Sequence, residues 1–269
     1  MLPAVQVQSA EDVWARIAAE AARDGGAGVV ATDGDGTLWS GDIGEDLFFA
    51  FVDHGRIEEP ALEAIRREAR THALSDAGSG PEVAHRIYDA YVEGRFPEER
   101  VCELMAWCFA GWRRDEVAAF ARGVVNDGGL DGRLHREVLA GLDRARAAGI
   151  ETILVSASPV AVVEAAGARL GFASGAIVAA HPRLDGDLVL PDVHRPIPYG
   201  AGKVSRLRER IGDSRTLYGA FGDNAFDVAL LQSARVGVAV RPKPRLRERA
   251  HEVPGVVELQ PSQSAAHMR

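Results

Sequence analysis

The sequence predicts an α/β fold, a doubly wound and mostly parallel sheet, with an all-helical domain inserted into it. Short apolar runs of β type alternate with helical periodicity near the N-terminus and again from 126 to 260. Between 41 and 125 the strand signals nearly vanish, and apolar residues recur at helical spacing. We therefore expect a core made of 1–40 and 126–260, with the helical domain 41–125 lying over its strand ends as a lid.

The composition is that of an ordinary globular protein. The chain has 269 residues, 46% hydrophobic and 26% charged, enough for a core domain with a sizeable insertion. Its net charge of −8 disfavours a nucleic-acid partner. No apolar run reaches the ~18 residues of a membrane span, and the N-terminus lacks a basic-then-apolar signal pattern. We therefore expect a soluble, cytoplasmic protein without a membrane partner.

The first elements lead to a strand that ends in acidic residues. Residues 1–8 are expected to be a loose lead-in. Ser9 can cap a helix that runs to about Arg23 and that Gly25 and Gly26 end. A strand over 28–32 follows directly.

The inserted domain is predicted to be helical throughout. Its apolar stripes are Leu47–Val52, Ala61–Ile65, Val83–Tyr91, Val101–Cys108 and Val117–Val124. The two cysteines, Cys102 and Cys108, fall on different sides of one helix, so we expect buried thiols rather than metal ligands.

The α/β alternation resumes after residue 129. The expected elements are a helix over 134–148, a strand over 150–155, a helix from Pro159 to about 171, a strand over 176–180, a turn at 184–187 between short β segments, a helix from Lys203 to 212, and strands over 216–221, 236–240 and 256–259. The basic run 241–249 is interpreted as a solvated helix face, and the tail 261–269 is expected to be disordered.

Two carboxylates stand where the first core strand ends. Asp33 follows the strand and Asp35 comes one residue later, so both point into the crevice at the carboxyl edge of the sheet. Neighbouring carboxylates repel each other, and a hard cation such as Mg²⁺ is the expected compensation. A calcium-binding EF-hand loop is excluded because Leu38 and Gly44 occupy the positions that need Gly and Glu. A plain polar turn is the remaining alternative.

Three further sites place polar residues at strand ends or helix starts. Ser156 follows a strand, Lys203 lies near a helix start, and Asp223 and Asp227 flank the end of another strand. Each has an ordinary alternative: a helix cap for Ser156, a surface lysine for Lys203 and a turn for Asp223. A doubly wound sheet brings all of them to one edge, and this coincidence favours a shared site.

The order of these motifs resembles that of the haloacid dehalogenase superfamily. The pattern is Asp-x-Asp-Gly-Thr-Leu, then Ser after an apolar strand, then Lys, then Gly-Asp-x-x-x-Asp, and it covers 28–40 and 150–240. The helical block is similar to the cap domain that phosphoserine-phosphatase-like members carry after the first motif. The resemblance implies a Rossmann-like core and phosphoryl chemistry, because dehalogenases lack the second Asp.

The resemblance also implies roles for the catalytic residues. Asp33 would be the nucleophile that forms an aspartyl-phosphate, and Asp35 the general acid and base. Ser156, the amide of Ala157, and Lys203 would bind and neutralise the phosphoryl oxygens.

The same resemblance implies a metal site. Mg²⁺ would be held by the Asp33 carboxylate, the Asp35 main-chain carbonyl and Asp223. Asp227 and Asn224 would form the surrounding shell, where Asp227 supports the metal's waters or orients Lys203.

The substrate-binding residues are less clearly indicated. Phosphoserine phosphatases place a Glu after the first motif to meet the substrate amine, and Asp42 stands at the matching position, where it is equally suited to cap a helix. Phe226 replaces an Asn that those enzymes carry before the final Asp. Arg95 is a candidate for binding a substrate carboxylate. An aromatic set is interpreted as core packing rather than a substrate cage: Trp39, Phe48, Trp107 and Trp112.

These observations predict a Mg²⁺-dependent phosphomonoesterase acting on a small soluble phosphorylated metabolite. An acidic rim near the leaving group would suit an amine-bearing substrate similar to phosphoserine. Two alternatives stay open: a phosphotransferase or mutase, and a non-catalytic phosphate-binding regulatory protein. The sequence predicts neither the substrate nor the oligomeric state.

Overall fold

A single parallel sheet forms the centre of the molecule. The computed structural model describes residues 5–262, and most of the tail expected to be disordered (261–269) lies outside them. The strand order is β1-β9-β8-β7-β2-β3-β4. The strands are β1 (Gln6–Gln8), β2 (Val29–Thr32), β3 (Glu151–Pro159), β4 (Ile177–Ala180), β7 (Leu217–Gly222), β8 (Val236–Val240) and β9 (Val257–Leu259). The predicted α/β fold class is confirmed.

Strand β2 is the point where the winding of the sheet reverses. It pairs in parallel with β3 on one side and with β7 on the other, and all four of its residues are buried. The chain builds β3 and β4 on one side and then crosses to build β7, β8 and β9 on the other. Such a reversal leaves a crevice outside the carboxyl ends of the central strands, where α/β proteins bind ligands.

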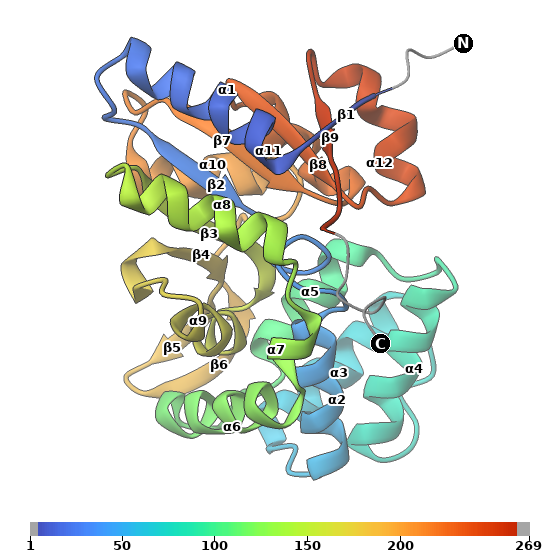
Figure 1. Cartoon of the computed structure of the whole chain (residues 1–269). Coiled ribbons are helices and arrows are strands. Elements are labelled where there is room, and N and C mark those ends of the chain that lie inside the picture. The colour runs from blue at the N-terminus through green and yellow to red at the C-terminus, as the bar shows by residue number, and fades with distance from the viewer. Residues whose placement is uncertain (1–4, 263–269) are drawn as a thin grey trace, which may run out of the picture.

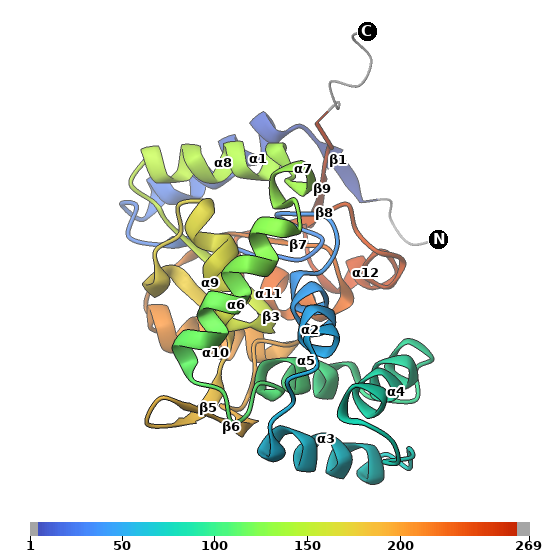
Figure 2. The ribbon, with the colours of Figure 1, turned by 90° about the horizontal axis from the view of Figure 1, so that it is seen from below.

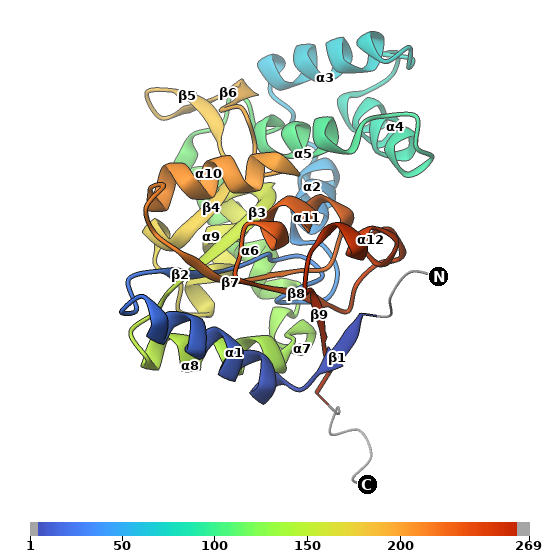
Figure 3. The same cartoon turned by 90° about the horizontal axis from the view of Figure 1, so that it is seen from above.

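Helices cover both faces of the sheet (Figure 3). One face carries α1 (Ala10–Arg23), α8 (Arg136–Ala147) and α9 (Val160–Arg169), and the other carries α10 (Ala201–Ile211), α11 (Val228–Gln232) and α12 (Pro244–Arg249). Trp14 of α1 stacks on Phe221 of β7 with ring centroids 5.3 Å apart. The opposite face is closed by Leu207 and Ile211 of α10. The sheet is therefore buried on both sides, which suits its continuously apolar strands.

Five helices between β2 and β3 form the insertion, called the cap from here on (Figures 1 and 2). They are α2 (Ile43–His54), α3 (Glu59–Thr71), α4 (Gly80–Val92), α5 (Glu98–Trp107) and α6 (Arg114–Asp127), and the short α7 (Leu130–Arg133) follows. The expected domain boundary between 125 and 126 falls inside α6, which packs along α9 of the core. The four aromatic residues expected in the core are all buried: Trp39, Phe48, Trp107 and Trp112.

A β-hairpin from the core extends the cap. It consists of β5 (Pro182–Asp185) and β6 (Leu188–Val193), which pair antiparallel around the predicted turn. The backbone of Val189 donates to Trp112 and accepts from Gly111, with N–O distances of 3.0 and 2.9 Å. In the same region the backbone of Arg114 donates to Asp187 at 2.8 Å. The hairpin and the cap are thus joined by main-chain hydrogen bonds.

Most predicted elements are confirmed to within a few residues, and two details were wrong. Residues 6–8 are not a loose lead-in, because they form β1 and pair with β9. Three residues on an edge give too weak a pattern to read from sequence. Pro159 precedes α9 as its N-cap instead of lying in its first turn. Within residues 5–262, no helix has the length and apolar character needed to cross a membrane.

Candidate active site

Polar residues from three neighbouring strands meet at the carboxyl edge of the sheet. Asp33 follows β2, Asp223 follows β7, and Ser156 lies in the last part of β3. The loop after β2 passes very close to Asp223: a Cβ on Gly36 would lie 2.2 Å from Asp223 Oδ2. Gly36 also has a φ of +78°, which L side chains rarely adopt. Glycine in the first motif therefore allows the two strand ends to approach.

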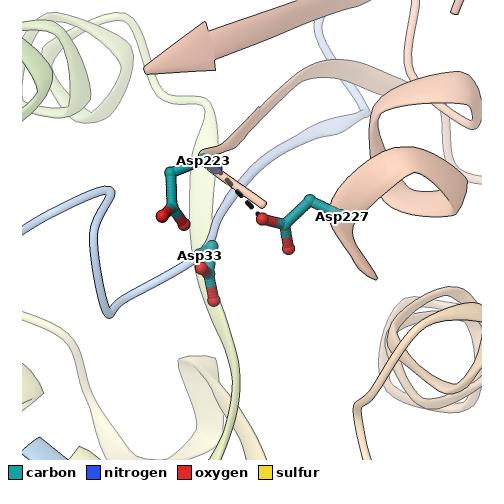
Figure 4. A group of neighbouring side chains, drawn as sticks. All are labelled: Asp33, Asp223 and Asp227. Atoms are coloured by element: carbon teal, nitrogen blue, oxygen red, sulfur yellow. Dashed lines mark hydrogen bonds between the residues drawn. The ribbon is translucent and has the colours of Figure 1, made fainter. Parts of the chain in front are cut away.

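Three carboxylates form a buried cluster here (Figure 4). Asp33, Asp223 and Asp227 each offer an oxygen within 4.8 Å of the others, and none of them is more than 2% exposed. Asp227 Oδ2 accepts the backbone N–H groups of Asp223 at 3.0 Å and Asn224 at 2.9 Å. Because its other oxygen binds Lys203, Asp227 has both oxygens occupied and acts as a support within the cluster.

Lys203 is the cation buried in this cluster. Its ammonium group donates to Asp33 Oδ1 at 2.7 Å and to Asp227 Oδ1, and the residue has no exposed surface. Burial lowers the pKa of Lys203, but the charges of Asp227 and Asp33 outweigh that effect and raise it above its usual value. Lys203 is therefore charged at neutral pH. An ammonium has three donors, so one remains beyond these two carboxylates.

The cluster has three carboxylates and one buried cation, so its negative charge is not fully balanced. Burial, followed by the charge of Asp227, raises the pKa of Asp33 well above its usual range despite the nearby Lys203. One buried oxygen, Asp33 Oδ2, accepts no hydrogen bond from any residue that the structure describes, and Asp223 Oδ2 has only the half-exposed ammonium of Lys243 beside it. Carboxylate oxygens of a buried acidic group are the ligands that Mg²⁺ prefers. The residues present therefore fit a divalent, oxygen-seeking cation.

Asp35 is held in one orientation by donors on both sides. Its Oδ1 accepts from Trp39 Nε1 at 2.8 Å and from the backbone of Ile43 at 2.7 Å. Its Oδ2 accepts from Ser158 Oγ at 2.7 Å, with Ser156 Oγ at 3.4 Å. Because two donors come from the loop that leads into α2, the position of this carboxylate depends on how the cap begins.

The segment 156–158 lies inside the site. Ser156 does not cap α9, because the N-cap of that helix is Pro159 and no side chain caps it. Its Oγ instead accepts the backbone N–H of Ser158 at 3.1 Å. Sequence reasoning missed Ser158 as a partner of Asp35. A second polar residue two positions after Ser156, hence on the same side of the strand, was the available signal.

A cavity of about 300 Å³ opens above these residues, between the core and the cap. Core residues that line it include Asp33, Asp35, Ser156, Ala157, Ser158 and Asn224. Cap residues that line it include Asp42, Glu45, Tyr91, Glu98, Cys102 and Met105. Lys203 is not among the lining residues and lies behind Asp33. A volume of this size admits a small molecule.

The candidate substrate residues have different positions. Asp42 lines the cavity and also caps α2, since its Oδ1 accepts the backbone N–H of Glu45 at 2.9 Å. Burial, and then the charge of Asp35, raises the pKa of Asp42 well above its usual range. Arg95 lies on the exposed loop after α4, pairs with Glu93, and does not line the cavity. This placement disfavours the predicted contact of Arg95 with a substrate carboxylate.

Lys243 reaches the cavity from the segment interpreted as a solvated helix face. Its Nζ lies 2.9 Å from Asp223 Oδ2, and about half of its side chain is exposed. Lys243 is the N-cap residue of α12, and its backbone N–H donates to the Asp223 carbonyl at 2.8 Å. The contact of Lys243 with Asp223 could not be predicted from the sequence, because one lysine among several arginines carries no distinguishing pattern.

Solved structures share this fold at low sequence identity. A protein of unknown function from Bordetella pertussis Tohama I matches with a TM-score of 0.67 and 21% identity, over 86% of this chain and 97% of that chain. A functionally unknown protein from Anaerococcus prevotii DSM 20548 matches with a TM-score of 0.60 and 15% identity, over 86% and 84%. A HAD family hydrolase from Salmonella enterica serovar Typhi matches with a TM-score of 0.54 and 17% identity, over 86% and 66%.

These likenesses show the fold alone, and a comparison with curated proteins found no significant match. The family model of haloacid dehalogenase-like hydrolases matches residues 30–232, which include all the motifs above and the whole cap. This chain therefore belongs to the haloacid dehalogenase-like hydrolase family.

Proposed function

We propose that this protein is a Mg²⁺-dependent phosphomonoesterase that acts on a small phosphorylated metabolite through a phosphorylated aspartate. The observation that carries the proposal is the unpartnered Oδ2 of Asp33, which is buried at the base of a cavity and held in place through Oδ1 by Lys203. A carboxylate oxygen fixed in this way suits in-line attack on phosphorus.

The chain's own residues support two half-reactions. Asp33 attacks phosphorus, and the bond from phosphorus to the leaving oxygen breaks while Asp35 gives that oxygen a proton. Asp35 then takes a proton from a water molecule, which attacks the phosphoryl group and restores the Asp33 carboxylate. Lys203 offsets the charge of Asp33 and Asp227, and the segment that contains Ser156 and Ala157 supplies donors to the phosphoryl oxygens.

Asp33, Asp223 and the Asp35 carbonyl would hold the metal. Bound Mg²⁺ would neutralise charge on the phosphoryl oxygens. The same proposal includes a cytoplasmic location and no nucleic-acid or membrane partner.

Hydrolysis of p-nitrophenyl phosphate tests this function. We expect turnover that requires Mg²⁺, that EDTA abolishes, and that Asp33→Asn reduces by more than about 10³-fold. Asp213→Asn is the matched control, because Asp213 is an exposed aspartate in the turn after α10. Turnover that survives in Asp33→Asn would show that another residue is the nucleophile.

Product analysis separates the alternatives. Phosphate transfer to an added alcohol at the expense of hydrolysis would indicate a phosphotransferase. Tight phosphate binding without turnover on any phosphomonoester would indicate a non-catalytic binding protein.

A further inference from the structure

The half of the cavity formed by the cap has its own charge character. Asp42 and Glu45 lie at the start of α2, and Glu98 at the start of α5, and all three line the cavity. Among the residues that the structure describes, none of the three forms an ion pair. We refer to Asp42, Glu45 and Glu98 as the acidic wall. Asp33 and Asp35 line the same cavity, so under the proposed function the acidic wall lies near the group that leaves from phosphorus.

The acidic wall disfavours further negative charge in this half of the cavity. Burial raises the pKa of the Cys102 thiol well above its usual value, and the charges of Asp42 and Glu98 raise it further. Burial, together with the charges of Glu98 and Glu45, raises the pKa of the Tyr91 hydroxyl in the same way. Groups along this wall are therefore disfavoured as anions, and a cation there is favoured.

The negative charge of the acidic wall is not needed to balance the cations at the catalytic end of the cavity. Under the proposed function, Lys203, Lys243 and Mg²⁺ together balance the four carboxylates Asp33, Asp35, Asp223 and Asp227. That balance leaves three carboxylates of the wall without positive charge. Acidic residues in the first turn of a helix do favour its dipole, but that effect does not require them to face a cavity.

The cavity offers little to an anionic leaving group. Of the described residues that line it, Lys243 alone is basic, and its ammonium lies 2.9 Å from Asp223. Arg95, the predicted partner of a substrate carboxylate, pairs with Glu93 outside the cavity. A carboxylate on the leaving group would therefore face the acidic wall without a counter-ion.

We infer that the acidic wall is a cation subsite and that the substrates are phosphate monoesters of amino alcohols that carry no carboxylate. A primary ammonium would donate hydrogen bonds to the wall carboxylates, while a trimethylated one would contact the aromatic lining at Tyr91 and Phe226. The inference rests on the proposed function and adds the chemistry of the leaving group.

Matched substrate pairs test the subsite. The wild-type enzyme with Mg²⁺ is assayed on 2-aminoethyl phosphate and on propyl phosphate, which has nearly the same shape but no charge, and then on phosphoserine, which adds a carboxylate. We expect kcat/KM to be at least about tenfold higher for 2-aminoethyl phosphate than for either of the others. The trimethylammonium analogue, compared with 3,3-dimethylbutyl phosphate, shows whether the subsite prefers a primary or a quaternary amine.

Two neighbouring glutamates separate the subsite from a helix-dipole effect. Glu98→Gln is expected to lower the preference for 2-aminoethyl over propyl phosphate about tenfold. Glu99→Gln is the control, because Glu99 lies in the same helical turn but is exposed and does not line the cavity. Comparing ratios between variants cancels the intrinsic reactivity of the two esters. Equal ratios in the wild type and Glu98→Gln would overturn the inference.

The failure of the subsite and the failure of the enzyme function are distinguishable. Mg²⁺-dependent hydrolysis of propyl and aryl phosphates without any cation preference would overturn the subsite and leave the phosphatase intact. If no ester is hydrolysed, the proposed function fails, and calorimetric binding of 2-aminoethyl and propyl phosphate to Asp33→Asn decides the subsite. Tighter binding of the amine ester supports it, and equal binding overturns it.

Discussion

At the core end of the cavity the carboxylates meet lysines or several hydrogen-bond donors, whereas at the cap end three carboxylates face the cavity with no ion pair among the described residues. Lys203 bridges Asp33 and Asp227, while Asp35 accepts from both sides. In the acidic wall the donors are uncharged: the Glu45 amide binds Asp42, and the hydroxyls of Tyr88 and Tyr199 donate to Glu45 and Glu98. The comparison teaches that the core end is held in a fixed geometry by its own residues, whereas under the inference above the cap end would receive positive charge from a ligand.

Removing the buried lysine should have the largest effect. Lys203→Met leaves Asp33 and Asp227 buried without their shared cation. Because breaking a buried ion pair costs about 3–5 kcal/mol, we expect a loss of stability of that size. We also expect turnover to fall by more than about 10³-fold, since Asp33, the proposed nucleophile, loses the group that holds it in place. Denaturant unfolding and aryl phosphate assays measure the two effects. A variant that keeps a tenth of the activity would show that the core end tolerates disorder.

Crowding the core end should have the next largest effect. Gly36→Ala forces an unfavourable φ and pushes a methyl group against Asp223, so we expect a loss of about 1–3 kcal/mol. The Mg²⁺ concentration needed for half-maximal activity should rise as well. Gly123→Ala in α6 is the control, because its methyl group would meet nothing within 4 Å. Equal behaviour of the two variants would contradict the close approach at Gly36.

Asp42 both caps helix α2 and contributes a carboxylate to the acidic wall, and two substitutions separate these roles. Asp42→Asn keeps an oxygen for the Glu45 amide and should leave stability nearly unchanged, whereas Asp42→Ala removes the cap and should cost about 0.5–2 kcal/mol. Both variants remove the charge, so both should lose selectivity for a cationic ester. Thermal unfolding and the substrate ratio report the two roles. Selectivity that survives in Asp42→Asn would remove Asp42 from the acidic wall.

Lys243 lines the cavity beside Asp223, at the core end. Its half-exposed ammonium lies beside Asp223 Oδ2 and would repel a cation bound at that carboxylate, and pairs of this kind contribute about 0–1 kcal/mol. We therefore expect Lys243→Met to bind Mg²⁺ up to about fivefold more tightly, as measured by calorimetry. Weaker metal binding in this variant would mean that the lysine holds Asp223 in place for the metal and that its charge does not weaken metal binding.

His135 should give the stability of the folded protein a modest dependence on pH. Its Nδ1 lies 2.9 Å from the Thr37 carbonyl in the loop of the first motif, and burial lowers the pKa of this histidine below 6.5. As the pH falls through 6.5, His135 therefore takes up a proton more readily in the unfolded chain than in the folded one. The stability that the neutral His135 contributes is thus fully present above that pH and declines below it. His135→Gln should lose less stability than the wild type between pH 7 and pH 5. Identical slopes would contradict the prediction.

The parts of the site that lie next to a strand end were predictable, and those that depend on packing between distant elements were not. Asp33, Asp35 and Asp223 were identified because an apolar strand followed by an acid is a local pattern. The contacts of Lys243 and Ser158 depend on how α12 and β3 approach the first motif, which no local pattern encodes.

The cap shows the same limit. Its helices were predicted from periodicity, but Glu98 carries no motif, because it reaches the cavity only through the packing of α5. Arg95 was named for its charge, yet the loop after α4 directs it to Glu93. Helical periodicity therefore predicted which elements exist and not which of their side chains meet.

The hairpin β5–β6 limits how this protein can be re-engineered. Its main-chain hydrogen bonds at Val189 and Asp187 connect a segment encoded after β4 to residues 111–114, which are encoded before β3. A chimera that exchanges only the contiguous stretch 41–125 would therefore separate the cap from the hairpin with which it forms these main-chain hydrogen bonds. Transferring the cap together with the hairpin that it pairs with requires two separate pieces of gene, one for the cap helices and one for the hairpin.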